Sequence, residues 1–188
     1  MTSIFVRILA ALALLCLLPI LLVLGILVMV LQGRPVLFRQ MRSGQGATPF
    51  ELIKFRSMRD TRDEDGNLLP DDMRTTGIGK FLRRSRLDEL PGIWNVVKGD
   101  MGIVGPRPLL PDTIAELGEI GQKRQSLRPG LTGWSQVSGN TLLTLDQKVA
   151  LDLWYIENRN FALDMQIIAR TVIVMVGGEK LTPDIPEN

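Results

Sequence analysis

The sequence predicts an α/β fold that is mainly helical, with one small β-hairpin and an N-terminal helix for the membrane. Three observations lead to this prediction. Residues 8–31 form an apolar run without a charged side chain. Two short strand-like stretches flank a glycine-containing loop at 44–46. The second half of the chain carries apolar residues at helical spacing. With 188 residues, the chain is long enough for one domain with its own core.

The apolar run is long enough to reach across a bilayer. As a straight helix it would measure roughly 36 Å, against a hydrocarbon core of about 30 Å. It is too long for a signal peptide, and Leu15 before Cys16 argues against a lipoprotein site. Pro19 lies at its middle and favours a kink. Cations flank both ends and therefore give no orientation: Arg7, Arg34, Arg39 and Arg42. These residues alone leave a spanning helix and a re-entrant helix equally open.

After residue 34 the pattern changes to short soluble elements. Residues 36–42 and 50–56 are predicted to be the two strands of a hairpin. Residues 59–72 are rich in Asp and Glu but lack the spacing of a calcium loop, so we expect a solvated loop. Helices are predicted over 90–98, 113–125, 145–157 and 161–176. The last is apolar nearly all round and too short to span, so it should be buried or lie against the membrane.

Composition limits the chemistry that the chain can perform. There is no histidine, and the only cysteine, Cys16, lies in the apolar run. A disulfide within the chain is excluded, and a zinc cluster is not expected. The net charge of +2 and the 5% aromatic content do not indicate a nucleic-acid partner. An enzyme of this composition would use carboxylates, hydroxyls or lysine, with any metal a hard cation bound by oxygen.

Two adjacent acids, Asp88 and Glu89, stand just before Pro91 and just after three arginines. Proline is tolerated in the first turn of a helix, so a helix containing 90–98 should begin near Asp88. Asp88 would then be a helix N-cap, which is the plain structural interpretation. A helix N-terminus also attracts phosphate groups, and the nearby arginines would add to that attraction. Capping and phosphate chemistry both remain open from these residues alone.

Three further segments display cations. Arg107 lies between two prolines, which hold the backbone extended and present a guanidinium that can bind phosphate through two hydrogen bonds. Arg128 opens the glycine-containing segment 128–133, which alone would be a turn. Lys54 and Arg56 alternate on a predicted strand and so share one face. Each segment also has an interpretation without a function. Arg107 would lie in a rigid connector, Arg128 in a turn, and Lys54 and Arg56 at a solvent-exposed strand edge.

Together, these segments resemble one family. The matching motifs are Arg42-Ser43-Gly44, residues 54–58 (Lys-Phe-Arg-Ser-Met), residues 87–91 (Leu-Asp-Glu-Leu-Pro), residues 95–100, residues 105–108 (Gly-Pro-Arg-Pro), residues 128–134 and Leu153-Trp154-Tyr155. Their order and approximate spacing are similar to those of the monotopic phosphoglycosyl transferases, which begin bacterial glycan assembly on a polyprenol phosphate. The resemblance covers essentially the whole chain, and each motif is weak alone.

The resemblance implies a reaction and roles for particular residues. A sugar-1-phosphate would move from a nucleotide-diphosphate sugar, expected to be a UDP-sugar, to the polyprenol phosphate undecaprenyl phosphate. Asp88 would attack the phosphate that bears the sugar, with Glu89 as its acid or base partner. Mg²⁺ would be the cofactor, bound near Asp88. The cations that would hold phosphates are Lys54, Arg83, Arg107 and Arg128.

The resemblance also implies a location. Residues 1–33 would form a re-entrant membrane helix and residues 34–188 a catalytic domain that forms one structural unit with it. The site would face the cytoplasm at the bacterial inner membrane, among membrane lipids. Ser135, Ser138 and Asn140 stand where the family commonly has Ala, Asn and Arg, which leaves the identity of the sugar and nucleotide open. A lipid-binding adaptor and a magnesium-dependent hydrolase are the alternatives, and the sequence indicates no oligomeric state.

Overall fold

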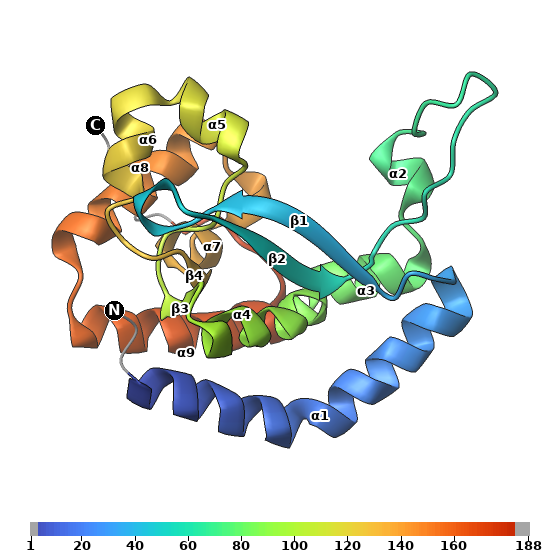
Figure 1. Cartoon of the computed structure of the whole chain (residues 1–188), viewed down its shortest axis with the longest axis horizontal. Helices are drawn as coiled ribbons and strands as arrows, with labels where there is room; N and C mark the ends of the chain where they lie inside the picture. Colours follow the sequence, from blue (N-terminus) through green and yellow to red (C-terminus); the bar gives the residue numbers. More distant parts are fainter. Residues whose placement is uncertain (1–3, 183–188) are drawn as a thin grey trace.

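The structure is a computed structural model that describes residues 4–182. Figure 1 shows a mostly helical molecule with two small sheets. The helices are α1 (Ile4–Gln32), α2 (Asp71–Arg74), α3 (Gly77–Arg84), α4 (Ile93–Lys98), α5 (Pro111–Glu116), α6 (Gly118–Arg124), α7 (Trp134–Val137), α8 (Leu145–Asn158) and α9 (Phe161–Gly177). The strands are β1 (Leu37–Ser43), β2 (Pro49–Phe55), β3 (Gly102–Val104) and β4 (Gly130–Thr132). Short 3-10 turns cover Gln45–Ala47, Leu87–Gly92 and Asn140–Leu142. The predicted fold class is confirmed.

The N-terminal apolar run folds as α1, a single helix that includes Pro19 and bends near its middle (Figure 1). It is long and apolar enough to cross a membrane. One stripe at helical spacing packs against the rest of the protein: Val6, Ala10, Leu14, Leu17, Leu21, Leu24 and Val28. Most other side chains are exposed apolar groups, including Phe5, Leu15 and Val30. An apolar face of this extent fits lipid rather than water.

Both ends of α1 are attached to the domain that follows. Near its N-terminus, Arg7 Nε donates a hydrogen bond to the Val97 carbonyl at 2.8 Å. At its C-terminus, Gln32 Nε2 donates to the Arg56 carbonyl at 2.8 Å, and the Arg56 guanidinium donates to the Gln32 carbonyl. Arg56 thus fixes the end of α1 and does not share a site with Lys54. The helix therefore lies along the domain over its whole length.

The predicted hairpin is confirmed, with each strand displaced by one residue. β1 and β2 are antiparallel, and Phe38 lies opposite Lys54 while Arg42 lies opposite Phe50. Cross-strand partners share a face of the sheet, so Arg42 and Lys54 project to the same side. The Lys54 ammonium lies 5.2 Å from the centre of the Phe38 ring. One face of the hairpin therefore presents two cations.

A second, parallel pair of strands was not predicted. β3 pairs with β4, and the Gly105 N–H donates to the Thr132 carbonyl at 3.0 Å. A Cβ at Gly130 would lie 2.1 Å from the Gly105 nitrogen, and one at Gly133 would lie 2.1 Å from the Gly105 oxygen. Only glycine permits this approach of two backbones. The segments 105–108 and 129–133 are therefore packed directly against each other.

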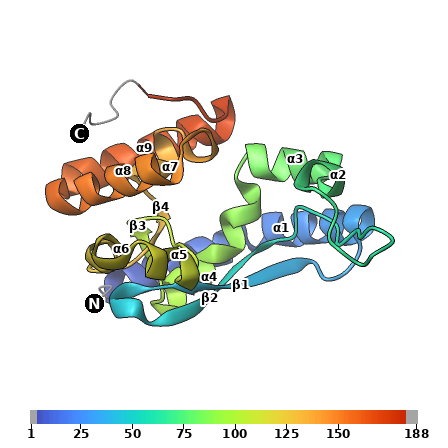
Figure 2. The ribbon, with the colours of Figure 1, turned by 90° about the horizontal axis from the view of Figure 1, so that it is seen from above.

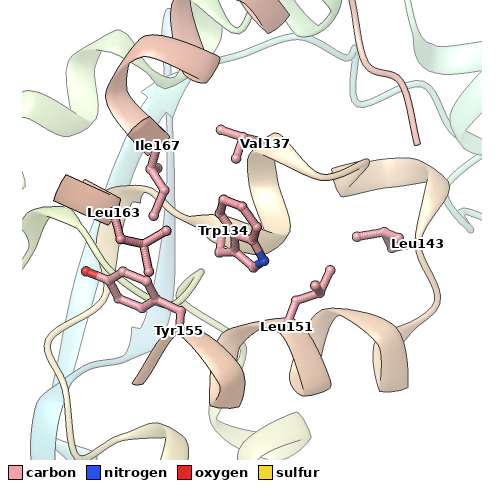
Figure 3. Close-up of a cluster of buried hydrophobic side chains, with 7 residues drawn as sticks. All are labelled: Trp134, Val137, Leu143, Leu151, Tyr155, Leu163 and Ile167. Carbon is pink, nitrogen blue, oxygen red and sulfur yellow. The ribbon is translucent and has the colours of Figure 1, made fainter. Parts of the chain in front are cut away.

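The C-terminal helices form their own core, in which apolar side chains of α7, α8 and α9 meet (Figure 3). Trp134 stacks on Trp154 with 5.3 Å between ring centres. Figure 2 shows these helices as a layer on the opposite side of the molecule from the hairpin. The predictions for 145–157 and 161–176 are confirmed to within one residue. The outer side of α9 exposes Phe161, Ile173 and Val176, which fits contact with a membrane.

Two predictions about local structure need correction. The helix expected over 113–125 is broken into α5 and α6, because Gly118 adopts a left-handed φ of 56° that an α-helix cannot contain. Residues 59–72 are indeed largely loop, in which the Asp63 carboxylate accepts hydrogen bonds from two backbone N–H groups of its own turn. The end of that stretch begins the short α2, and α3 was not predicted at all.

Candidate active site

Asp88 and Glu89 lie in the 3-10 turn Leu87–Gly92, which joins α3 to α4. The turn starts after Arg86, whose φ is 55°. This turn runs directly into α4 at Ile93, so the helical segment does begin near Asp88, as predicted, although its first part is 3-10. The N-cap position belongs to Arg86 and not to Asp88, so the capping interpretation of Asp88 was wrong. Pro91 lacks the N–H that an α-helical hydrogen bond would need, which explains the tighter turn. Asp88 therefore lies within the turn, and its side chain is buried with 6% of its surface exposed.

Glu89 pairs with Arg107, and this contact joins the turn to segment 105–108. The Arg107 Nη2 lies 2.9 Å from Glu89 Oε1. Burial alone would raise the pKa of the Glu89 carboxyl, but the charge and hydrogen bond of Arg107 prevail and lower that pKa. The same pair raises the pKa of the Arg107 guanidinium, chiefly through the charge of Glu89. Glu89 is therefore an ionised, partnered carboxylate at neutral pH.

Asp88 has a different electrostatic environment. Burial raises the pKa of its carboxyl from 3.8 to about 6, and the charge of Glu89 adds to the effect. Lys54, Arg107 and Arg83 act in the opposite direction. Two adjacent carboxyls with pKa values moved apart are a common arrangement at catalytic sites. Asp88 is still mainly ionised near pH 7, but it is poorly solvated, which suits a nucleophile.

Lys54 and Arg42 complete the cleft from the hairpin. The cleft is lined by Arg42, Leu52, Ile53, Lys54, Glu89, Met101, Arg107, Pro108, Gly130, Leu131 and Gln136. Burial lowers the pKa of Lys54, and the carboxylates of Asp88 and Glu89 oppose that effect. Burial, aided by the charge of Arg107, lowers the pKa of Arg42 to about 10. Arg42 was missing from the predicted site, although it opens a motif of the resemblance.

Arg83 and Arg86 both precede the turn, but they make different contacts. Arg83 is exposed on α3 and lines a separate polar pocket with Lys80, Arg84, Thr75, Thr141 and Glu179. Its charge still lowers the pKa of Asp88. Arg86 is buried, and its Nη2 donates to the Gln136 carbonyl at 2.5 Å and to Glu179 at 3.2 Å. Arg83 therefore borders the site, while Arg86 holds structure behind it.

Arg128 is not in the cluster around Asp88. It lines a pocket between the start of α1 and the α8–α9 corner, with Val6, Tyr155 and Phe161 among its neighbours. The structure thus places three of the predicted side chains, Glu89, Lys54 and Arg107, in the lining of one cleft. Asp88 is buried beside Glu89, where the charges of Lys54, Arg107 and Arg83 act on its carboxyl. Arg128 lies elsewhere, although its segment packs against 105–108.

The residues that depart from the family pattern have identifiable contacts. Ser135 Oγ donates to Asp152 Oδ1 at 2.7 Å, and Asn140 Nδ2 donates to Glu179 Oε1 at 2.5 Å. Asn140 therefore borders the polar pocket of Arg83, whereas Ser135 faces the interior. Of these departures, Asn140 is the one placed to affect what that pocket holds.

Within residues 4–182, no group of three or more acidic, histidine or cysteine side chains could hold a metal ion by itself. Mg²⁺ often uses one or two protein carboxylates and takes its other ligands from water and substrate phosphates. Glu89 is already paired with Arg107, whereas Asp88 has no such ion pair in the described structure. A single carboxylate of this kind is compatible with Mg²⁺ that arrives with a diphosphate.

A membrane helix attached along a domain, with a buried carboxylate facing several cations, defines a membrane-associated enzyme for anionic substrates. The comparison with known families agrees. Residues 1–178 match the family described as bacterial sugar transferase, and the chain belongs to that family.

Individual relatives show the same relationship. The chain is 44% identical over 164 residues to a Bacillus subtilis protein named "uncharacterized sugar transferase EpsL", with 87% of this chain and 81% of that protein covered. It is 39% identical to the UDP-glucose:undecaprenyl-phosphate glucose-1-phosphate transferase of Xanthomonas campestris, with 91% of this chain but 38% of that protein covered. It is 34% identical to the UDP-N-acetylgalactosamine-undecaprenyl-phosphate N-acetylgalactosaminephosphotransferase of Aeromonas hydrophila, with 85% and 40% covered.

Proposed function

We propose that this protein is a phosphoglycosyl transferase that moves a sugar-1-phosphate from a UDP-sugar to undecaprenyl phosphate. The observation that carries the proposal is the buried Asp88 carboxylate, which faces Lys54, Arg107 and Arg83 beside the Glu89–Arg107 pair. The names of the Xanthomonas and Aeromonas relatives support the donor and the acceptor. Both relatives are more than twice as long as the matched part, so the activity of the whole proteins is carried over as a proposal.

The first chemical step forms a covalent intermediate on Asp88. A carboxylate oxygen of Asp88 attacks the phosphorus atom that bears the sugar. The bond from that phosphorus to the oxygen of the nucleoside monophosphate breaks, and the nucleoside monophosphate leaves with the electron pair. Burial of Asp88 supports this role because a poorly solvated carboxylate is a stronger nucleophile than a solvated one.

The second step returns the enzyme to its starting state. A phosphate oxygen of the polyprenol phosphate attacks the phosphorus of the aspartyl phosphosugar. The bond between phosphorus and Asp88 breaks, the carboxylate is restored, and a polyprenol-diphospho-sugar is released. Glu89 lies beside the reacting group and is held by Arg107, so it can orient the incoming phosphate and hold a proton when that phosphate arrives protonated.

The cations hold the phosphates in place during both steps. Phosphoryl transfer depends mainly on positioning and on neutralising charge. Lys54 and Arg42 project from one face of the hairpin, and Arg107 lines the same cleft. When bound, Mg²⁺ would neutralise further charge on the diphosphate, and Asp88 is the side chain that would hold it.

The membrane helix brings the site to its lipid substrate. Both ends of α1 are hydrogen-bonded to the same domain, at Arg7 and at Gln32. A helix that crossed the bilayer would carry its N-terminal end away from that domain. The bend at mid-helix and these two attachments support a re-entrant helix with both ends on one side. Nucleotide sugars are soluble, so we place the site on the cytoplasmic face of the bacterial inner membrane.

The release of nucleoside monophosphate tests the proposed function. Purified protein is incubated with UDP-sugars and Mg²⁺, with and without undecaprenyl phosphate. A transferase sustains release only when the acceptor is present and forms a lipid-linked product. Release that needs no acceptor would identify a hydrolase instead. No release with any of a panel of UDP-sugars, together with binding to anionic vesicles, would identify an adaptor.

A further inference from the structure

The backbone of Arg107 has few ways to form hydrogen bonds. Pro106 and Pro108 have no N–H, so Arg107 carries the only backbone donor in 106–108. Burial raises the pKa of the Asp152 carboxyl, and the Arg107 N–H is one of the groups that oppose this rise. The Arg107 carbonyl accepts a hydrogen bond from Nη2 of Arg124. Side chains from two other helices, α6 and α8, therefore lie around the backbone of Arg107, and one of them holds its carbonyl.

Those two side chains form a buried ion pair. Arg124 Nε lies 3.0 Å from Asp152 Oδ2, and the exposed fractions of the two residues are 4% and 0%. Ser135, on α7, is 1% exposed and donates to the other oxygen of Asp152 at 2.7 Å. Asp152 thus accepts hydrogen bonds from a guanidinium and a hydroxyl.

A buried ion pair is poor evidence for stability, because desolvation of the two charges offsets their attraction. An apolar pair would pack equally well between α6 and α8. What an apolar pair could not do is donate a hydrogen bond to the carbonyl of Arg107. The presence of charges at this place therefore indicates a positioning role.

The position of Arg107 matters because its side chain reaches Glu89, 2.9 Å away. The backbone just before Arg107 is fixed as well, because Gly105 packs against Gly130 and Gly133 without room for a Cβ at either of them. A shift of about 1 Å in a group that aligns a reaction can cost on the order of 100-fold in rate. A fixed starting point for the Arg107 side chain is therefore valuable at a phosphate site.

We propose that Arg124, Asp152 and Ser135 are positioning residues that clamp the backbone of Arg107 and thereby hold its guanidinium on Glu89. The clamp acts through Arg107 and touches no substrate. Its effect on turnover rests on the proposed function, whereas its effect on the Arg107–Glu89 contact does not.

The first test reads the contact itself and needs no substrate. The Nη–H signals of Arg107, which include the Nη2 donor to Glu89, are identified in nitrogen-15 spectra by their loss in Arg107→Lys, and their exchange with solvent is measured. Asp152→Asn and Ser135→Ala should each speed this exchange by about threefold or more. Glu157→Gln is the matched control, because it removes an exposed ion pair (Lys123 Nζ to Glu157 Oε1, 2.5 Å) between the same two helices. The control should leave the exchange unchanged.

The second test is a double-mutant cycle in kcat/KM. Ser135→Ala should lower kcat/KM by about threefold in the parent and have almost no effect in Arg107→Lys, because the side chain that it positions is already replaced. Its effect on the melting temperature should be the same in both backgrounds. If Asp152→Asn does not fold, Ser135→Ala decides alone, since it removes one neutral hydrogen-bond donor.

The outcomes separate the two proposals. Unchanged Arg107 exchange in Ser135→Ala, or equal losses of kcat/KM in both backgrounds, would overturn the clamp and leave a purely structural ion pair. Failure of the parent protein to transfer any sugar phosphate would overturn the proposed function, and the exchange measurement would still decide on the clamp.

Discussion

Arg107 and Glu89 are 18 positions apart in sequence, and the Arg107 guanidinium donates to the Glu89 carboxylate at 2.9 Å. This contact assigns different states to the two adjacent acids. Glu89 keeps a lowered pKa because of its partner, whereas Asp88 has a raised pKa because of its burial and of Glu89 itself. The contact with Arg107 therefore keeps Glu89 ionised, while Asp88 is the poorly solvated carboxylate that we propose as the nucleophile.

Replacement of Arg107 tests the shape of this contact. Arg107→Lys keeps the charge but loses the planar group that can bind phosphate and carboxylate through two hydrogen bonds. We expect kcat/KM to fall by about tenfold or more, equivalent to about 1.4 kcal/mol of transition-state stabilisation. Arg39→Lys is the control, because Arg39 forms a similar 3.0 Å pair with Glu51 on the exposed side of the hairpin. Equal activity of Arg107→Lys and the control would reduce segment 105–108 to a connector.

Replacement of Asp88 should separate activity from stability. Asp88→Asn cannot form the acyl phosphate, so turnover and any trapped phosphosugar adduct should be lost. A pKa raised from 3.8 to about 6 means that ionised Asp88 destabilises the fold at neutral pH, by up to about 3 kcal/mol. The neutral amide removes that penalty. The melting temperature of Asp88→Asn should therefore exceed that of the parent at pH 7.5 and approach it near pH 4.

The exposed acid Asp112 provides the control for this variant, since Asp112→Asn should change neither property. Substantial steady turnover by Asp88→Asn would remove Asp88 from the nucleophile's role. A lower melting temperature at pH 7.5 would show instead that the carboxylate is well solvated or well paired.

The pH dependence of kcat/KM should report Asp88. The nucleophile must be ionised, so activity should rise with pH along a limb centred near the Asp88 pKa of about 6. Arg83 lowers that pKa, so Arg83→Gln should move the limb to higher pH. Arg84→Gln is a matched control from the same helix and pocket, because Arg84 is not among the charges that act on Asp88. Identical acid limbs for both variants would contradict the electrostatic role of Arg83.

Tight binding of the metal ion to the protein should require the nucleotide part of the sugar donor. If Asp88 supplies one ligand and the diphosphate supplies others, chelation should abolish turnover and Mg²⁺ should restore it. Mn²⁺ used as a paramagnetic substitute should bind tightly only when UDP is also present. Tight binding of Mn²⁺ to the protein alone would require a set of protein ligands that the described residues do not form.

Sequence reasoning succeeded where local pattern decides structure. Strand-like patterns around a glycine-containing loop predicted the hairpin, and helical spacing predicted α8 and α9. The structure adds that their N-caps are Thr144 and Asn160. It failed where structure depends on distant contacts. The pairing of Gly102 with Gly130 joins segments 28 positions apart, so β4 looked like a turn. Gly118 stood within an apparent helix, and its left-handed φ leaves no signature in apolar spacing.

In the candidate site, too, local sequence pattern predicted some features, and others depend on distant contacts in the fold. Motif spacing identified Asp88, Glu89, Lys54 and Arg107, but it could not show that the turn around Asp88 would bury the carboxyl. Arg42 was missed as a site residue because its place in the cleft depends on the fold, where its Nη1 donates to the Pro108 carbonyl at 3.2 Å. A usable signal existed, since Arg42 and Lys54 occupy the same face of the predicted hairpin.

The topology of α1 is the prediction that sequence left most open. The attachments at Arg7 and Gln32 favour a re-entrant helix, because they hold both ends against one domain. Against this, proline-containing helices that cross membranes are common, and a turn within lipid leaves backbone groups that need partners.

The accessibility of engineered cysteines decides between a re-entrant and a spanning α1. Cys16 is first changed to Ala, and Ser3→Cys and Ser126→Cys are prepared in that background, where Ser126 is an exposed residue of the catalytic domain. A thiol reagent that cannot cross membranes is applied to intact and to opened cells. We expect both cysteines to be labelled only after the cells are opened. Labelling of Ser3→Cys from outside, with Ser126→Cys still protected, would establish a spanning helix and reject the re-entrant arrangement.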